Sequence, residues 1–492
     1  MSGAYDVIII GAGIGGLAAA GLLARRGRRV LVLERHAVVG GYCSSFRRGR
    51  FIFDAAVHAV GGCAPGDLID RWLEEVAGDH DLRFQRLDPF YVVQVDGERV
   101  AVPADLDELQ ALLIQMAPTD ANAVRKWTAE IKTMGSTLIE GGASPVQQAD
   151  LLQRIGRVSW AEFLAGRFTT PKLEAILGAL CLYAGLEPER LSAAFMLGVL
   201  YSYCRGAYYP AGGSQHLTNV MAGSIRRWGG EVRCRAAVDR ILLSDEIVWG
   251  VRLASGEEIQ AGAVISNADA GRTLMEMVGK ESLPLPFQRK LSRLERSVSS
   301  VTMYLGVKQG GWNVPSHETF YLPSWRPIST NEFYYRPGSH SAPPVLSVCV
   351  PTLSEPDLAP PGHHILCITT CCHAAETEAI RQERGKEFVE ADLLQHVEHL
   401  IPGVTGQIRY RETATPRTFE RYTQNRAGSI YGWAKSTTQS WTSGIGPKTP
   451  VQGLYMAGHW TQGVHGVYGA FRSGCATAEA VLELQKEGSL HG

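Results

Sequence analysis

The chain has 492 residues, too many for a single hydrophobic core, so we expect two or three structural domains. Apolar residues make up 45% and charged residues 20%, with a net charge of −1, which is ordinary for a globular enzyme and argues against a nucleic-acid partner. The ten cysteines show neither a CxxC pair nor the spacing of metal ligands, so we expect reduced thiols, no metal and a cytoplasmic location.

The first forty-one residues predict a nucleotide-binding βαβ unit. An apolar run over 7–10 ends on glycines spaced as GxGxxG, a helix of small residues follows, and a second apolar run over 30–33 ends on Glu34. In such a unit the glycines allow a tight turn and the approach of a pyrophosphate, which the N terminus of the helix binds. The acid then accepts hydrogen bonds from ribose hydroxyls, which argues against the 2′-phosphate of NADP.

A second pair of glycines, Gly40 and Gly41, follows this unit. It resembles an extension of FAD enzymes in which the backbone runs close under the flavin ring, so we expect FAD as the cofactor. The residues that we expect to contact FAD come from this unit and from four later segments. They are Gly11, Gly13, Ile14, Gly15, Gly16, Glu34, Arg35, Gly40, Gly41, Tyr42, Val57, His58, Val238, Asn267, Gly458, His459, Gly466 and Val467.

Residues 51–54 predict a strand that ends on Asp54, with His58 just beyond it. Two interpretations of His58 remain open. It either faces the flavin and a substrate double bond as a proton donor, since imidazole titrates near neutral pH, or it is a hydrogen-bonded histidine of a loop. We expect Asp54 to be a structural hydrogen-bonding residue rather than a catalytic base.

The chain from 67 to 205 predicts a β-hairpin with its turn at 95–98, followed by helices. One helix is expected after Asp105, a second from about Asp120 to Ile139, and more over 146–205. The last region is dense in apolar and aromatic side chains. These either pack in a core or form the wall of a long apolar tunnel.

The second half of the chain predicts a return to the nucleotide-binding domain and then a further sheet. A Pro/Gly turn at 208–214 precedes a helix over 215–228, a strand over 231–243, its hairpin partner over 247–257 and a short strand over 263–266. Four strand-like stretches and a helix over 386–400 fit an antiparallel sheet with helices on one face.

The last segment predicts a second contact with the flavin. A buried parallel strand over 453–457 ends at Gly458, and a helix begins near Tyr468. The N terminus of that helix would stabilise negative charge on the flavin ring. We therefore expect a discontinuous FAD-binding domain (1–66, 210–270 and 416–492), a substrate-binding domain (67–102 and 271–415) and a helical subdomain (103–209).

Four motifs carry a resemblance to a known superfamily. They are GAGIGGLAAAGLLARRGRRVLVLE, GGYCSSFRRGRFIFDAAVHAVGG, YYPAGGSQHL and GLYMAGHWTQGVHGVYGAFRSG. In this order they resemble the FAD enzymes that include phytoene desaturases, carotenoid isomerases and retinol saturases. The resemblance implies an α/β fold, with a Rossmann-type, GR2-like FAD-binding domain, an α+β substrate-binding domain and a helical subdomain.

The resemblance also implies a reaction, namely desaturation or cis–trans isomerisation of a long apolar polyene or isoprenoid. Contact with a peripheral membrane surface or a carrier protein stays open. His459 stands where many such flavoproteins carry an acid, and Val464 and His465 stand where proline and glycine are common. His58, His459 and His465 are therefore the candidate acid/base groups, and Tyr431 and Trp433 are expected to shape the site.

Three other functions remain open. A flavin amine oxidase would carry an aromatic cage opposite the flavin and typically a lysine near its N5 atom, neither of which the sequence places. A saturase would reduce a double bond of a carrier-bound or lipid polyene. A non-catalytic flavin-binding or chaperone-like protein would not require any particular polar residues in the site.

Overall fold

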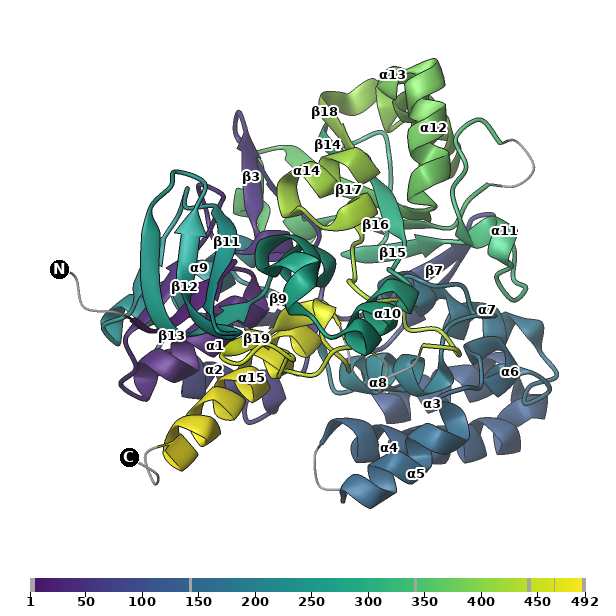
Figure 1. The fold of residues 1–492 in the computed structure, drawn as a ribbon. Coiled ribbons are helices and arrows are strands. Elements are labelled where there is room, and N and C mark those ends of the chain that lie inside the picture. Colours follow the sequence, from purple (N-terminus) through teal and green to yellow (C-terminus); the bar gives the residue numbers. More distant parts are fainter. Residues whose placement is uncertain (1–4, 141–143, 340–342, 440–443, 464, 489–492) are drawn as a thin grey trace.

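The computed structural model describes residues 5–140, 144–339, 343–439, 444–463 and 465–488. Two large sheets lie side by side, and a helical region lies next to the second of them (Figure 1). The α/β fold predicted from the sequence is confirmed.

The first sheet has the strand order β10-β2-β1-β13-β12-β11, and β19 also pairs with β13. β1, β2, β10, β13 and β19 run parallel, as the continuous apolar runs of the first two strands predict, because strands of parallel sheets are buried on both faces. The bounds are β1 (Tyr5–Ile10), β2 (Val30–Leu33), β10 (Glu231–Arg233), β11 (Val238–Ser244), β12 (Ile247–Leu253), β13 (Glu258–Ser266) and β19 (Leu454–Met456).

Four helices pack against one another beside this sheet, with α1 in contact with each of the others (Figure 1). They are α1 (Ile14–Arg25), α2 (Leu68–Ala77), α9 (Ser214–Arg227) and α15 (Gly466–Gly488). The first and last helices of the chain, α1 and α15, therefore lie together.

The expectation of one strand over 231–243 is wrong. β10 pairs with β2, whereas β11 pairs with β12 in an antiparallel hairpin. The break lies at Arg235, whose φ of 55° is incompatible with an extended strand. The Pro/Gly turn also begins later than expected, because residues 207–210 form β9.

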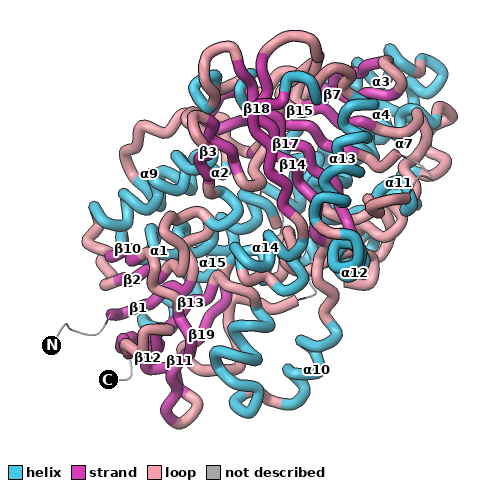
Figure 2. Tube along the Cα trace, turned by 90° about the horizontal axis from the view of Figure 1, so that it is seen from above, coloured by secondary structure: helices cyan, strands magenta, loops and turns pink. Residues whose placement is uncertain are grey.

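The second sheet has the order β18-β14-β17-β16-β15-β7-β8. It is antiparallel except for the parallel pair β15–β7. Helices α12 and α13 lie over one face (Figure 2), where α13 shares a hydrophobic core with the strands. The bounds are β7 (Tyr91–Val95), β8 (Glu98–Val102), β14 (Ser299–Lys308), β15 (Glu318–Tyr321), β16 (Leu346–Cys349), β17 (His363–Cys372), β18 (Ile408–Ala414), α12 (Ala374–Arg384) and α13 (Lys386–Leu400).

The helical region begins where the sequence predicts, at Asp105, whose carboxylate caps the next helix by accepting from the N–H groups of Asp107 and Glu108. Its helices are α3 (Leu106–Met116), α4 (Ala121–Ile139), α5 (Pro145–Ile155), α6 (Trp160–Leu164), α7 (Pro171–Ala179) and α8 (Ala193–Tyr203). Within the described ranges, none of the helices combines the length and apolar character needed to cross a membrane.

Short elements connect these units. They are β3 (Ser45–Arg48), β4 (Phe51–Asp54), β5 (Val60–Gly61), β6 (Phe84–Arg86), β9 (Ala207–Pro210), α10 (Leu285–Arg293), α11 (Thr330–Phe333) and α14 (Pro416–Thr423). Asp54, at the end of β4, is buried and accepts hydrogen bonds from the Tyr209 hydroxyl and the Ser214 N–H. This agrees with the structural role expected for Asp54.

Candidate active site

Backbone from three segments meets at the carboxyl ends of β1, β13 and β19. A Cβ atom at Gly13 would lie 2.7 Å from Nδ2 of Asn267, and one at Gly15 would lie 2.7 Å from its Oδ1. Gly458 has a φ of +83°, and a Cβ there would lie 2.2 Å from the same Oδ1. The three glycines thus let their backbones lie against the Asn267 side chain, at the edge where open α/β sheets bind their ligands.

The N terminus of α1 lies at this edge of the sheet. Its N-cap is Gly13, and among the described residues no side chain caps the helix. The first N–H groups of α1 are therefore left for an anionic ligand such as a pyrophosphate. Ile14 is the buried first residue of the helix. A Cβ at Gly16 would lie 2.1 Å from the Gly11 oxygen, so Gly16 is required for close packing of the helix on its strand.

Glu34 holds the glycine turn in place. Its buried carboxylate accepts hydrogen bonds of 2.8 Å from the N–H groups of Ala12 and His36, one on each oxygen. A carboxylate has about four acceptor sites, so two remain for ribose hydroxyls. Arg35 points elsewhere, because its guanidinium donates to the carbonyl groups of Arg421 and Tyr422.

The other residues expected on the nucleotide side lie around this turn. The N–H of Gly40 donates to the Ala12 oxygen at 2.8 Å, and Gly41 follows it. The N–H of Ala236 donates to the Glu34 oxygen at 2.8 Å, which places Val238, at the start of β11, two residues from that contact.

His459 and Tyr42 lie together next to Gly458. Their ring centroids are 6.0 Å apart, and Nε2 of His459 is 3.5 Å from the Asn425 amide nitrogen. Burial and the charge of Lys435 lower the pKa of His459 to about 4. The imidazole is therefore neutral at pH 7 and is a weak proton acceptor.

His465 lies at the other side of the same segment. Its Nε2–H donates to the Ala184 oxygen at 3.1 Å, and its ring stacks on Tyr431 with centroids 4.1 Å apart. Burial, with the nearby Lys435, lowers the pKa of His465 well below its ordinary value, so it also stays neutral. Val464 lies outside the described residues.

Lys435 is a buried residue that the sequence did not single out. It is 1% exposed. Burial lowers its pKa to about 7. When protonated it lies near enough to His459 and His465 to disfavour a charge on either.

A cavity lies between the helical region and the start of α15. It is lined by Ala59, Val60, Gly61, Ile139, Tyr183, Gly198, Val199, Ser202, Tyr203, His465, Gly466, Val467 and Tyr468. The apolar helical region contributes to the core and to this cavity, while the long apolar tunnel stays a prediction. Tyr183 and Tyr203 line the cavity, whereas Phe195 and Met196 are fully buried in the core.

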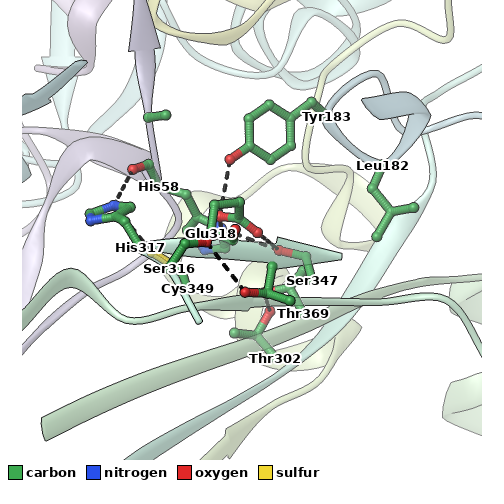
Figure 3. Close-up of polar contacts among 12 residues, drawn as sticks. His58, Leu182, Tyr183, Thr302, Ser316, His317, Glu318, Ser347, Cys349 and Thr369 are labelled. Carbon is green, nitrogen blue, oxygen red and sulfur yellow. Dashed lines mark hydrogen bonds and ion pairs between the residues drawn. The ribbon is translucent and has the colours of Figure 1, made fainter. Parts of the chain in front are cut away.

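Glu318 is the centre of a buried hydrogen-bond network beside this cavity (Figure 3). Its side chain is 0% exposed. One carboxylate oxygen lies 3.0 Å from Nδ1 of His58 and accepts from the Tyr183 hydroxyl at 3.0 Å, and the other accepts from the Ser347 hydroxyl at 2.6 Å. Val57, next to His58, is buried.

Strand alternation explains why these polar groups meet. Side chains two residues apart share a face, so Glu318 points to the same side as Phe320, away from α12 and α13. On the neighbouring β16, Cys349 pairs with Glu318 and Ser347 pairs with Phe320, which places both on that side. Glu318 was missed in the sequence, because an acid at the start of a strand that also contains Thr319 gives no local sign of its buried partners.

His317 fixes the backbone of His58. Its Nε2–H donates to the His58 oxygen at 2.9 Å, and its Nδ1 accepts from the Ser354 hydroxyl at 2.8 Å. Burial lowers the pKa of His317 to about 4, so this neutral arrangement persists at pH 7. The structure thus brings His58 and His465 to the cavity region, His58 through Tyr183, while His459 lies at the Tyr42 side.

Comparison with known proteins identifies relatives that are similar to this chain in sequence. The family described as flavin containing amine oxidoreductase matches residues 14–482. The phytoene desaturase (neurosporene-forming) of Rhodobacter capsulatus is 26% identical over 97% of this chain and 94% of its own length. The chloroplastic prolycopene isomerase 1 of an Oncidium hybrid is 26% identical over 97% of this chain and 84% of its own. The all-trans-retinol 13,14-reductase of Danio rerio is 26% identical over 92% and 82%.

Solved structures show the same fold. An oxidoreductase from Methanosarcina mazei superimposes with a TM-score of 0.68 and 17% identity, over 96% of this chain and 100% of that one. At this identity the likeness concerns the fold alone. The arrangement of two sheets and a helical region is therefore shared with known oxidoreductases.

Proposed function

The chain belongs to the family of flavin-containing amine oxidoreductases, and from this premise we propose that it desaturates or isomerises a long apolar polyene or isoprenoid with FAD as its cofactor. The relatives named above act, by their names, on phytoene, prolycopene and retinol, and they match almost the whole chain. The observation that carries the proposal is the cavity beside Gly466 and Val467, because its lining is mostly apolar and aromatic.

The residues at the carboxyl ends of β1, β13 and β19 suit FAD. The uncapped N terminus of α1 and the carboxylate of Glu34 suit a pyrophosphate and a ribose, and Asn267 and Gly458 lie next to them. Bound FAD supplies two-electron chemistry at a carbon–carbon bond. The cavity would hold the substrate chain against it, and this fixed orientation lowers the barrier.

Among the three candidate histidines, His58 suits the proton transfer best. His459 and His465 are held neutral by burial and by Lys435. His58 is 11% exposed, and its Nδ1 lies 3.0 Å from the Glu318 carboxylate, which can stabilise a positive charge on the ring. We assign to it the acid/base role in desaturation, saturation or isomerisation.

Delivery of the substrate is part of the proposal. A long polyene does not dissolve in water, so it has to come from a membrane surface or from a carrier protein. Co-sedimentation of the protein with lipid vesicles loaded with polyene tests the first of these sources.

Anaerobic incubation with a polyene tests the proposed function. The FAD-loaded protein is mixed with an acyclic polyene, once with oxidised and once with reduced flavin, and the mass and absorption spectrum of the product are determined. Loss of two hydrogens indicates desaturation, gain of two indicates saturation, and unchanged mass with a changed spectrum indicates isomerisation. If amines reduce the flavin and no polyene is converted, the protein is an amine oxidase instead.

A matched pair of variants links the reaction to the cavity. Val199→Phe places a ring in the cavity wall and is expected to reduce turnover at least about tenfold while FAD stays bound. Val146→Phe makes the same change at a position that is 77% exposed in the same helical region and is expected to leave turnover unchanged. Equal turnover of both variants would mean that the substrate lies elsewhere.

A further inference from the structure

The buried pair of His58 and Glu318 has the geometry of a proton-transfer unit. The Glu318 carboxylate is enclosed and is reached by three side chains, namely those of His58, Tyr183 and Ser347 (Figure 3). An ionised carboxylate is an acceptor only, so a site surrounded by donors matches the anionic form. The negative charge is therefore held next to the imidazole.

This contact determines which ring nitrogen of His58 carries the proton. Nδ1 lies 3.0 Å from the Glu318 oxygen, and the Ser347 hydroxyl lies 3.4 Å from the same nitrogen. With Nδ1–H as the donor to the carboxylate, the neutral imidazole keeps its lone pair on Nε2. In the described part of the chain Nε2 has no hydrogen-bond partner, and the side chain is 11% exposed.

The surroundings hold this orientation. The carbonyl of His58 accepts from neutral His317, so both the backbone and the ring of His58 are fixed. Tyr183 shares an oxygen of Glu318 with His58, its ring centroid is 6.4 Å from that of His58, and it lines the cavity. The pair is thus linked to the cavity wall through Tyr183.

We propose that Glu318 is a positioning residue that keeps the proton of neutral His58 on Nδ1, so that Nε2 is the atom that exchanges a proton with the substrate. This inference rests on the proposed function. In a desaturation with FAD as the oxidant, one carbon loses a hydride and its neighbour loses a proton. The electrons of the second C–H bond form the new π bond, and the proton passes to Nε2.

Glu318 then stabilises the imidazolium until Nε2 releases the proton to solvent. In a saturation the same atom supplies the proton. Cys349, whose thiol pKa burial raises well above its ordinary value, stays neutral beside the pair. His317 also stays neutral, so the other titratable neighbours of this pair add no charge at pH 7.

The test compares His58→Ala, Glu318→Gln and the double variant. His58→Ala is expected to keep FAD and lower the single-turnover rate about 100-fold or more, since general acid/base catalysis contributes about 10²–10⁴-fold. Glu318→Gln keeps the shape and removes the charge, and is expected to lower the rate at least about tenfold and to shift its pH profile. The double variant should be no slower than His58→Ala, because residues that act as one unit are not additive.

A second readout does not depend on turnover. Nitrogen NMR of the labelled protein reports which ring nitrogen of His58 is protonated, and we expect Nδ1–H in the wild type and a larger share of Nε2–H in Glu318→Gln. Glu412→Gln is the matched control. Glu412 lies on β18 of the same sheet and pairs with Arg48 instead of a histidine. It should change neither the tautomer nor the rate.

Three results would overturn the inference. The first is an unchanged His58 tautomer in Glu318→Gln, and the second is an additive loss of rate in the double variant. The third is a stoichiometric bound metal that Glu318→Gln loses, because Nδ1 of His58, the Glu318 carboxylate and Sγ of Cys349 lie within 4.8 Å of one another. If no polyene is converted by the wild type, the proposed function fails, and the tautomer measurement still decides the role of Glu318.

Discussion

At the scale of single residues, the site depends on contacts between segments that are far apart in the chain. His58 and Glu318 are 260 positions apart, and Tyr183 and Ser347 come from two further segments. Sequence reasoning could identify His58 because it lies in a recognisable motif. It could not find Glu318 or Lys435, because burial and partners of a side chain depend on which strands become neighbours.

Lys435 provides a prediction at this scale. Its pKa is about 7 in the folded chain and ordinarily 10.5, so between these values the unfolded chain binds more protons. Stability of the apoprotein should therefore rise with pH from about 7 to about 10.5 through this group. Below pH 7 the lysine is protonated in the folded chain as well, so the buried charge lowers the free energy of unfolding by its full amount.

Lys435→Met removes this cost. We expect it to stabilise the apoprotein at pH 6 by about 1–3 kcal/mol and to flatten the pH dependence above pH 7, as measured by urea unfolding. Lys308→Met, at an exposed position, is the control and should change little. A destabilised Lys435→Met protein with unchanged pH dependence would contradict the lowered pKa of this buried lysine.

At the scale of helices and strands, local pattern was a good guide where one element carries its own signal. The bounds of β2, β4 and α13 agree with the ranges read from the sequence. The strand over 231–243 was wrong because its apolar pattern does not reveal the turn at Arg235, which lets β10 and β11 join different partners. The parallel pairing of β15 with β7 is equally invisible in a local pattern.

The contact of α1 with α15 gives a prediction for elements. A Cβ at Gly474 would lie 2.2 Å from the Gly15 oxygen, so Gly474→Ala forces apart two helices whose backbones touch. We expect a loss of stability of about 1–3 kcal/mol, measured by urea unfolding, together with weaker FAD binding. Gly223→Ala is the matched control within α9, where nothing lies within 4 Å of an added Cβ.

In that control alanine should stabilise the helix by about 0.5–1 kcal/mol, because it has a higher helix propensity than glycine. If Gly474→Ala proved as stable as Gly223→Ala, the close packing of the first and last helices would be refuted.

At the scale of the whole molecule, two sheets divide the chain. We propose that residues 1–66, 210–270 and 416–492 form the FAD-binding domain, since they supply every strand of the first sheet. Likewise 67–102 and 271–415 supply the strands of the second sheet, and 103–209 the helical region. The fold class was predictable from the order of motifs, whereas the cavity between these parts required the structure.

Buried neutral histidines make the whole molecule sensitive to acid. His317 and His459 have pKa values of about 4 in the folded chain, against 6.5 ordinarily. Between these values the unfolded chain takes up protons that the folded chain does not, so stability should fall as the pH drops from about 6.5 to about 4. Urea unfolding of the apoprotein at several pH values measures this, and His317→Gln should reduce the slope. A slope that is unchanged in His317→Gln would show that His317 does not contribute.

The central claim is that the glycine turn after β1 and the glycine at the end of β19 hold one FAD between them. The most direct measurement is the amount of FAD released on denaturation from the purified wild type, Gly458→Ala and Gly223→Ala. We predict one FAD per chain for the wild type and Gly223→Ala, and little for Gly458→Ala, because its φ of +83° and the nearby Asn267 leave no room for a side chain. A wild type without FAD, or a Gly458→Ala protein that keeps its full amount, would contradict the account.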